Sequence, residues 1–227
     1  AGAPDGTPAP IVGAGAAVPL PALARQSAAR GLGGLEWAVG IPGSVGGAVR
    51  MNAGGHGGDI AACIESATVF DLRTGRSGVR GPDDLALGYR TSAVGPDDVV
   101  VGARLRCAAV DPDRARSELD AVVAWRRENQ PGGQNAGSVF ANPSGPAGPS
   151  GEEPGAGALI DGLGLKGHRL GTAHVSEVHA NFIVADPDGS ADDVAELIDF
   201  LADRVLAATG TRLRVEVRRV GFGAGDG

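Results

Sequence analysis

Residues 35–60 read LEWAVGIPGSVGGAVRMNAGGHGGDI, and this glycine-rich stretch decides the fold. Glycine has no side chain to bury and loses the most backbone entropy on folding, so packing alone does not explain its abundance. Glycine does allow positive φ angles and close approach of backbone N–H groups to a ligand, as in loops that bind a pyrophosphate. Aliphatic residues that can anchor such a loop to a core are interspersed: Leu35, Val39, Ile41, Val45, Val49 and Ile60. The stretch therefore predicts an anchored ligand-binding loop.

The composition limits the class of protein. A chain of 227 residues is long enough for one large or two small domains. Its net charge of −7 argues against a nucleic-acid or anionic-membrane surface, since both need clustered Lys and Arg. There is no apolar run of the roughly 18 residues that span a membrane, and no signal-peptide pattern. We expect a cytoplasmic protein that binds neither nucleic acid nor membrane.

Several other motifs are weak or missing. Residues 13–18, GAGAAV, depart from the dinucleotide fingerprint at the sixth position, so a plain turn is the better interpretation. Cys63 and Cys107 are far apart in the sequence and have no partner motif, which favours two buried free thiols in a reducing compartment. The histidines lack the spacing of zinc ligands on a helix, and no metal is expected: His56, His168, His174 and His179.

Strand and helix patterns alternate along the first half of the chain. Residues 11–18 predict a strand followed by a turn, and further strands are expected over 66–72 and 99–109. The expected helices are 20–31, ended by Gly31, and 115–128. The second of these helices has an apolar side formed by Leu119, Val122, Val123 and Trp125. The connections are too irregular for a repeating βαβ array, so the pattern predicts a mixed α+β fold.

The C-terminal part has the clearest pattern. Residues 181–185 predict a strand, and Ser190 with Asp193 forms an acidic version of a capping box. Apolar residues then recur at helical spacing until Gly210: Val194, Leu197, Ile198, Leu201 and Val205. Residues 212–220 alternate as a final strand.

Two short segments place a reactive residue beside rigid neighbours. In residues 88–92, GYRTS, the guanidinium of Arg90 can bind a carboxylate through two hydrogen bonds, although a surface ion pair is the plainer interpretation. In residues 137–143, GSVFANP, Ser138 follows a glycine in a strand ended by proline, although a serine alone is more often a turn or cap residue.

A third segment places two charged residues together. In residues 215–218, VEVR, Glu216 and Arg218 fall on one face of the expected strand because side chains alternate with a period of two. A solvated face would give the same pattern, so this segment does not by itself identify a site.

Taken together, the motifs resemble the UDP-N-acetylenolpyruvoylglucosamine reductase (MurB) family. The resemblance covers roughly residues 10–222, and it is specific as a set although each motif alone is weak. The matching segments occur in the order and spacing of the family: 40–48 (GIPGSVGGA), 88–92 (GYRTS), 134–143 (QNAGSVFANP), 156–161 (AGALID), 164–167 (GLKG), 175–184 (VSEVHANFIV) and 215–218 (VEVR).

The resemblance implies a fold and a reaction. The fold would be α+β, with a PCMH-type FAD-binding domain over residues 1–108 and a substrate-binding α+β domain over residues 109–227. The reaction would be that of UDP-N-acetylmuramate dehydrogenase, in which NADPH reduces a non-covalent FAD. The flavin then reduces UDP-GlcNAc-enolpyruvate to UDP-N-acetylmuramate for peptidoglycan, and hence for cell-wall biogenesis, cell shape and cell division. The protein would be a cytoplasmic monomer.

The resemblance also assigns residues to roles. Hydride addition to the enol ether leaves negative charge that spreads into the neighbouring carboxylate, so the site needs a cation or acid there and a proton donor at the adjacent carbon. Arg90 and Glu216 would hold and polarise the carboxylate, and Ser138 would supply the proton. The substrate would also contact Tyr89, Gln134 and Asn142. The cofactor would contact Ile41, Pro42, Gly43, Ser44, Val45, Gly46, Gly47, Asn52, Ala53, Gly54, Gly57 and Arg218.

Some residues depart from the family pattern. His56 occupies a position where many relatives have tyrosine, and Ala141 one where many have lysine, which removes a positive charge near the diphosphate. The short interval between Arg90 and Ser138 leaves no room for an extra tyrosine-bearing loop, so the chain resembles the shorter, type II branch. The family's N-terminal subdomain, which grips the FAD pyrophosphate from the other side, does not precede Ala1. We therefore expect an N-terminally truncated FAD-binding domain.

Two alternatives remain open at this stage. One is a degenerate flavin-fold fragment that binds a sugar nucleotide without catalysis, although such a protein has no chemical reason to keep Arg90, Ser138 and Glu216 together. The other is a different FAD oxidoreductase of the same fold, such as an alcohol oxidase. A covalent flavin at His56 would favour that second alternative.

Overall fold

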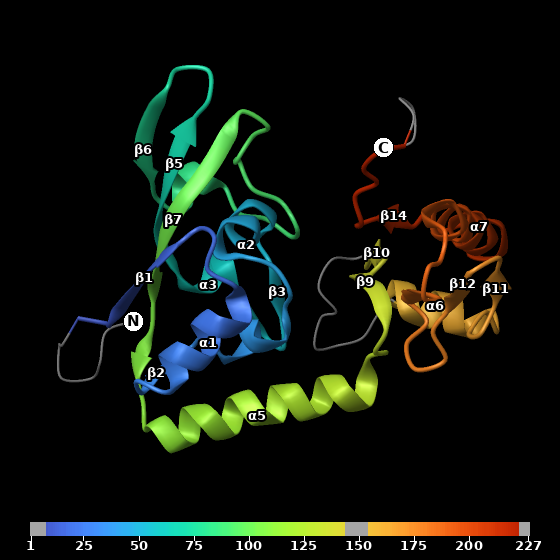
Figure 1. The fold of residues 1–227 in the computed structure, drawn as a ribbon, viewed down its shortest axis with the longest axis horizontal. Coiled ribbons are helices and arrows are strands. Elements are labelled where there is room, and N and C mark those ends of the chain that lie inside the picture. Colours follow the sequence, from blue (N-terminus) through green and yellow to red (C-terminus); the bar gives the residue numbers. More distant parts are fainter. Residues whose placement is uncertain (1–7, 144–153, 223–227) are drawn as a thin grey trace. The chain divides into compact units, whose positions relative to one another are not determined.

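The computed structural model describes residues 8–143 and 154–222 (Figure 1). The chain divides into two compact units, Ala1–Arg126 and Arg127–Gly227, and each has its own hydrophobic core. This division falls later in the chain than the expected boundary at 108/109. The reason is that helix α5 (Pro112–Asn129) buries Ala115 and Leu119 in the core of the first unit.

The first unit contains an antiparallel sheet of four strands, in the order β1-β7-β5-β6, with α1 (Leu20–Ala28), α2 (Val45–Met51) and α3 (Ile60–Cys63) on one side of it (Figure 1). The strands are β1 (Ile11–Gly15), β7 (Asp98–Arg106), β5 (Ile64–Asp71) and β6 (Arg76–Arg80). Small residues face each other in its centre, where Ala67 of β5 pairs with Ala103 of β7. Both are buried, and helix α2 packs against β7.

The glycine-rich stretch folds into several short elements. Leu35 and Trp37, at the start of this stretch, are buried in the same core as the apolar residues of helix α1 (Leu20–Ala28). The short elements are the 3₁₀ helix η1 (Glu36–Gly40), α2, the hairpin strands β3 (Gly54–Gly55) and β4 (Gly58–Asp59), and α3 (Ile60–Cys63). The predicted aliphatic anchors are confirmed for Leu35, Val39, Val45, Val49 and Ile60, which are buried, and Ile41 packs partly buried against them.

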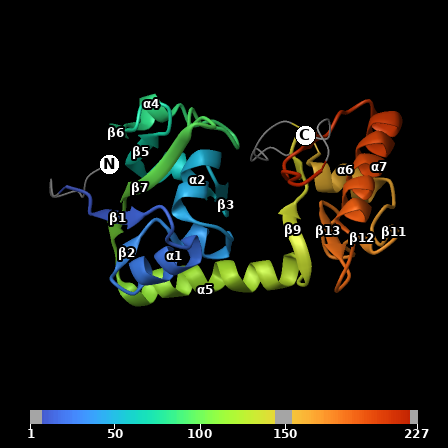
Figure 2. The ribbon, with the colours of Figure 1, turned by 45° about the horizontal axis from the view of Figure 1, so that its top comes forward.

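The predicted elements of this unit are confirmed with altered ends. The strand expected over 99–109 breaks at Cys107, whose N–H donates to the carbonyl of Pro10 at 2.8 Å, and resumes as β8 (Ala108–Ala109), paired with β2 (Leu32–Gly33). Helix α5 begins close to the end of α1, where a Cβ on Gly31 would lie 2.7 Å from the Val110 carbonyl oxygen (Figure 2). The short helix α4 (Pro82–Leu85) precedes the loop that leads into β7.

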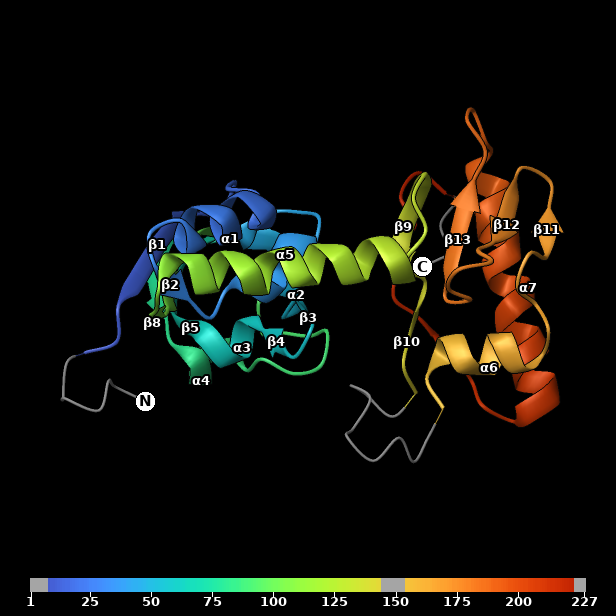
Figure 3. The ribbon, with the colours of Figure 1, turned by 90° about the horizontal axis from the view of Figure 1, so that it is seen from below.

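The second unit contains another antiparallel sheet, in the order β11-β12-β13-β9. The strands are β11 (Arg169–Leu170), β12 (Ala173–Val175), β13 (Phe182–Ala185) and β9 (Gln134–Ser138). Helix α7 (Ala191–Thr209) packs against β11 and β12, and α6 (Ala156–Gly162) contacts α7 (Figure 3). Leu197, Leu201 and Val205 of α7 are buried in this core, as their helical spacing predicts.

The capping of α7 follows the sequence only in part. Ser190 is the N-cap, and its hydroxyl accepts the N–H of Asp192 at 3.1 Å and of Asp193 at 3.5 Å. The carboxylate of Asp193 does not close the predicted box. It accepts the N–H and the hydroxyl of Thr172, both at 2.6 Å, because β12 begins beside the helix N-terminus. Gly210 has φ +73° at the C-terminus, as predicted.

The last predicted strand is much shorter than expected. Of residues 212–220 only β14 (Arg214–Val215) is a strand, because its partner β10 (Phe140–Ala141) offers only two residues for pairing. One further backbone bond extends the contact, from the Glu216 N–H to the Val139 carbonyl at 2.8 Å. The prediction that Glu216 and Arg218 share one face of a strand is therefore wrong, since the strand ends at Val215.

Asn181 stabilises the turn between β9 and β10. Its side chain is 5 % exposed, accepts the Phe140 N–H at 3.0 Å and donates to the Phe140 carbonyl at 2.8 Å. Its own carbonyl accepts the Val139 N–H at 2.9 Å. One asparagine thus satisfies the N–H and the carbonyl of Phe140, while Phe140 pairs with Val215 of β14 through the neighbouring backbone bond.

We expect Asn181→Ala to lower the free energy of unfolding by about 2–4 kcal/mol, because two buried backbone groups of Phe140 would lose their partner. Asn181→Asp keeps an acceptor for the N–H but buries a carboxylate against the Phe140 carbonyl, so its loss should be at least as large. Urea unfolding at neutral pH measures both variants. Equal stabilities for the wild type and both variants would contradict this role.

Candidate functional site

The glycine loop is bonded to the turn that follows β1. The N–H groups of Val45 and Gly46 donate to the carbonyls of Val18 and Ala16, each at 2.9 Å, and the Leu20 N–H donates to the Gly43 carbonyl at 2.9 Å. A Cβ on Gly46 would lie 2.9 Å from the Cβ of Ala16, so only glycine lets the two segments approach this closely. These contacts fix the path of the loop.

The outer side of the loop meets the requirements of a phosphate-bearing cofactor. Gly43 has φ +112° and Gly57 has φ +79°, and a Cβ on either would meet nothing within 4 Å. Pro42, Gly43 and Gly47 are exposed, and Ser44 caps α2 by accepting the Gly47 N–H at 3.4 Å. Exposed glycine backbone in the left-handed region is the surface to which a pyrophosphate can come close. The residues present therefore fit the FAD that the sequence predicts.

Asn52 has a different role from these glycines. It is 5 % exposed, lies in the left-handed region at φ +43°, and ends α2. Its side chain accepts the Ala61 N–H at 2.9 Å and donates to the Gly88 carbonyl at 2.9 Å. These contacts bind the loop internally and link it to the segment that carries Arg90.

Arg90 lies at the tip of a tight turn, where the Gly88 and Thr91 backbones bond to each other in both directions. Its φ of +58° lies in the left-handed region, which is strained for any residue other than glycine. Its guanidinium donates to the Gly54 carbonyl at 3.0 Å and lies 5.1 Å from the centre of the Tyr89 ring. The structure thus brings the predicted carboxylate-binding arginine against the predicted cofactor loop.

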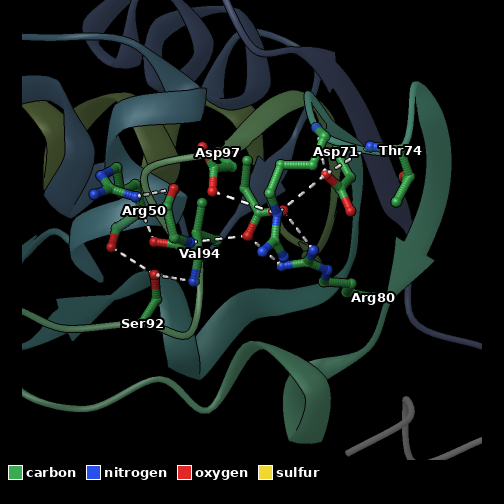
Figure 4. Close-up of polar contacts among 10 residues, drawn as sticks. Arg50, Asp71, Thr74, Arg80, Ser92, Val94 and Asp97 are labelled. Atoms are coloured by element: carbon green, nitrogen blue, oxygen red, sulfur yellow. Dashed lines mark hydrogen bonds and ion pairs between the residues drawn. The ribbon is translucent and has the colours of Figure 1, made fainter.

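A set of polar residues that the sequence did not single out holds this turn (Figure 4). The Arg50 guanidinium donates to the carbonyls of Val94 and Gly95, the latter at 2.7 Å. The Ser92 hydroxyl donates to the Arg50 carbonyl at 2.6 Å. Beyond them, Asp98 accepts two hydrogen bonds from Arg80, at 2.8 and 2.6 Å, and the Gly95 N–H at 2.8 Å. No periodic pattern marks such side chain–backbone contacts in a sequence.

In the second unit, Ser138 ends β9 and is exposed. Gly137 before it has φ +81°, and Val139 after it is buried. The bond from the Glu216 N–H to the Val139 carbonyl places Glu216 beside the residue that follows Ser138. The structure therefore brings the predicted proton donor and the predicted acid into the same neighbourhood of this unit.

The remaining predicted site residues of this unit are spread more widely. Gln134 is exposed at the start of β9 and lines an apolar pocket of about 200 Å³ with Val194, Ile198 and Val217. The amide of Asn142 accepts the Ala156 N–H at 3.1 Å and thereby holds the start of α6. Arg218 is exposed beyond the end of β14.

A second pocket, of about 340 Å³, lies in the first unit beside Trp37, His56 and Gly57. Both cysteines line it and both are buried free thiols, as predicted. Burial, and then the neighbouring Cys107, raise the pKa of the Cys63 thiol to about 12. Burial, followed by the charge of Glu36, also raises the pKa of Cys107.

His56 contacts helix α5. Its ring meets the Trp125 ring edge-on, with 4.7 Å between the centroids. Burial and then the charge of Arg126 lower the pKa of His56 and so favour the neutral ring. Trp125, expected on the apolar face of the helix, is instead 46 % exposed and covers the tip of the β3–β4 hairpin.

The described residues offer neither a metal centre nor a membrane-spanning helix. Within residues 8–143 and 154–222 there is no group of three or more His, Cys, Asp or Glu side chains arranged to hold a metal ion. In that same part of the chain, no helix combines the length and the apolar character needed to cross a membrane.

Comparison with known proteins identifies the class. Residues 8–77 match the family described as an FAD binding domain, and residues 129–220 match the C-terminal domain of UDP-N-acetylenolpyruvoylglucosamine reductase. The matches and the mixed α and β structure place the chain in the class of FAD-binding oxidoreductases.

Individual relatives identify the family. The chain is 45% identical to the UDP-N-acetylenolpyruvoylglucosamine reductase of Synechococcus sp. strain RCC307, over 93% of this chain and 68% of the relative. It is 43% identical to that of Gloeobacter violaceus, over 90% of this chain and 67% of the relative. The crystal structure of the Thermus caldophilus enzyme superposes with a TM-score of 0.77 at 37% identity, over 91% of this chain and 71% of that one.

The chain belongs to the UDP-N-acetylenolpyruvoylglucosamine reductase family, whose members use FAD and NADPH in peptidoglycan precursor synthesis. It spans about two thirds of the length of the curated relatives it matches.

We expect the stability of the first unit to fall in acid through Asp98. Its contacts with Arg80, followed by the Gly95 N–H, lower its pKa from 3.8 to about 2. Because the folded state holds this proton less tightly than the unfolded state, the contribution is complete above about pH 4 and is lost as the pH falls towards 2. The loss should amount to about 1–2 kcal/mol in denaturant titrations.

Asp98→Asn should remove this part of the acid dependence and lower stability at pH 7. Asp203→Asn, at an exposed position of α7, is the matched control. An unchanged acid profile for Asp98→Asn would show that the ion pair adds nothing to stability.

The two thiols should resist modification in the folded protein, because the thiolate is the reactive form and burial disfavours it. Ellman's reagent at pH 8 should label both cysteines quickly in denaturant and neither at a comparable rate under native conditions. Rapid native labelling of Cys63 would contradict the burial of this pair.

Proposed function

We propose that this chain reduces UDP-GlcNAc-enolpyruvate to UDP-N-acetylmuramate, with NADPH as the electron source and FAD as the bound cofactor. The observation that carries the proposal is the contact between the Arg90 guanidinium and the Gly54 carbonyl. It places a cation suited to a carboxylate directly against the loop whose open glycine backbone suits the cofactor.

Each residue of the site would have a separate task. FAD reduced by NADPH supplies the hydride that adds to the vinyl carbon of the substrate. Arg90 binds the carboxylate next to the reacting carbons and stabilises the negative charge that spreads into it. Ser138 donates its hydroxyl proton to the adjacent carbon, a role supported by its exposure at the end of a paired strand.

Glu216 would assist at the carboxylate. A charged glutamate would repel the substrate, so it acts as the protonated acid or shares a proton with the substrate carboxylate. Its backbone bond to Val139 supports a shared site with Ser138. Tyr89 beside Arg90, and Gln134 and Asn142 near β9, would complete the substrate site.

The cofactor would be held mainly by the exposed part of the glycine loop. Pro42, Gly43, Ser44, Gly47 and Gly57 would meet the pyrophosphate and ribose, and Arg218 would also contact the cofactor. Ile41, Val45, Gly46, Asn52, Ala53 and Gly54 would shape the loop. In this scheme residues 1–108 form the FAD-binding domain, which also supplies Tyr89 and Arg90 to the substrate, and residues 109–227 form the substrate-binding domain.

We also propose that the protein acts as a cytoplasmic monomer. Two buried free thiols suit a reducing compartment, and each unit encloses its own core within one chain. Light scattering after gel filtration would measure the mass directly.

Ser138→Ala should lower turnover of the enolpyruvyl substrate by about 10²–10⁴-fold, because the proton donor is lost. FAD binding, followed by absorbance, and reduction of the bound flavin by NADPH should stay at wild-type values. Ser117→Ala, at an exposed position of α5, is the matched control for a lost hydroxyl.

Glu216→Gln is the companion variant, with Glu196→Gln on the exposed face of α7 as its control. Near-normal turnover in both Ser138→Ala and Glu216→Gln would refute the assignment. A wild-type chain that binds the sugar nucleotide but never oxidises NADPH would instead support a non-catalytic binding protein.

A further inference from the structure

The segment 50–54 and the segment 88–95 are joined by hydrogen bonds along their whole length. Arg50, Asn52 and Gly54 lie in the first segment, at the end of α2 and the start of β3. Their partners in the second segment are Gly88, Arg90, Ser92, Val94 and Gly95. The cofactor loop and the substrate arginine are therefore parts of one bonded substructure.

Arg50 makes the largest share of these bonds. One guanidinium nitrogen, Nη1, donates to the carbonyls of both Val94 and Gly95. Its backbone carbonyl accepts the Ser92 hydroxyl, and the Ser92 oxygen accepts the Val94 N–H at 3.2 Å. The bonds close a ring that runs through Arg50, Ser92 and Val94 (Figure 4). Because the donor is charged, each bond to it is stronger than one between neutral groups.

The ring explains how Arg90 keeps an unfavourable backbone conformation. A non-glycine residue at φ +58° persists only where its surroundings hold it there. Asn52 fixes one side of the turn through the Gly88 carbonyl, and Arg50 with Ser92 fixes the other side. Asp98 holds the Gly95 N–H from the neighbouring strand. The turn is thus restrained at both ends while Arg90 lies between them.

We propose that Arg50 and Ser92 are positioning residues for the Arg90 guanidinium, and that they set the affinity of the site for the substrate carboxylate. This inference rests on the proposed function of Arg90. Neither residue needs to touch the substrate, because both act on the backbone that carries Arg90. Loss of the ring would let the turn relax to an ordinary φ and withdraw the guanidinium from the Gly54 carbonyl.

The test compares Arg50→Met, which keeps an unbranched apolar stem but removes the charge and the donors, with Arg50→Lys, which restores a charged donor. Hydrogen exchange of residues 86–95 should be at least tenfold faster in Arg50→Met and closer to wild type in Arg50→Lys. The KM for the enolpyruvyl substrate should rise about tenfold or more in Arg50→Met, while reduction of the flavin by NADPH keeps its wild-type rate. Arg25→Met, at an exposed position of α1, is the matched control.

Ser92→Ala provides a second route to the same ring if Arg50→Met folds poorly. It should give smaller changes of the same sign, with a melting temperature near that of the wild type. Unchanged exchange in residues 86–95 in both variants overturns the proposal, and so does faster exchange with an unchanged KM. If the wild type neither binds nor reduces the substrate, the proposed function fails, whereas the exchange data still decide whether Arg50 and Ser92 hold the turn.

Discussion

The path of the glycine loop depends on three backbone hydrogen bonds to the turn after β1, made by Leu20, Val45 and Gly46. These bonds, with the close contact between Gly46 and Ala16, decide where α2 begins. The end of α2 then decides where the Arg50 guanidinium lies, and Arg50 holds the turn that carries Arg90. A fixed loop path is therefore the physical condition for two features of the first unit: the open glycine surface, and the position of the arginine that we propose binds the substrate carboxylate.

In the second unit, the backbone around Ser138 is fixed by a buried side chain and one backbone bond. Ser138 ends a short edge strand, and the chain must turn there without a continuous partner. A buried amide, Asn181, satisfies Phe140, and the Val139 carbonyl accepts the Glu216 N–H, so the end of the chain returns to the same place. Ser138 itself still pairs with Phe182 at the end of β9, and it is exposed there beside the segment that Asn181 holds.

Much of the fold could be predicted because it depends on periodic patterns. The buried face of α7 follows from the helical spacing of its apolar residues. Its two ends follow from the residue types there, Ser190 as the N-cap and Gly210 at the C-terminus. The missed features depend on contacts between segments far apart in the sequence. Asp193 bonds to Thr172 rather than closing its own box, and β14 stops where its partner β10 stops. The ring of hydrogen bonds through Arg50, Ser92 and Val94 was missed for the same reason, since its acceptors include backbone carbonyls, which carry no sequence signal.

The strained backbone at Arg90 has a consistent physical explanation in this arrangement. A flexible arginine would lose side-chain and backbone entropy each time it bound a carboxylate, and that loss would weaken binding. Here the folded protein has already restricted the turn through Asn52 and Arg50, before any ligand arrives. The folding free energy of the sheet and α2 thus offsets the strain of the left-handed backbone conformation at Arg90. The benefit is a guanidinium whose position beside Gly54 is set in advance, as charge stabilisation in a developing transition state requires.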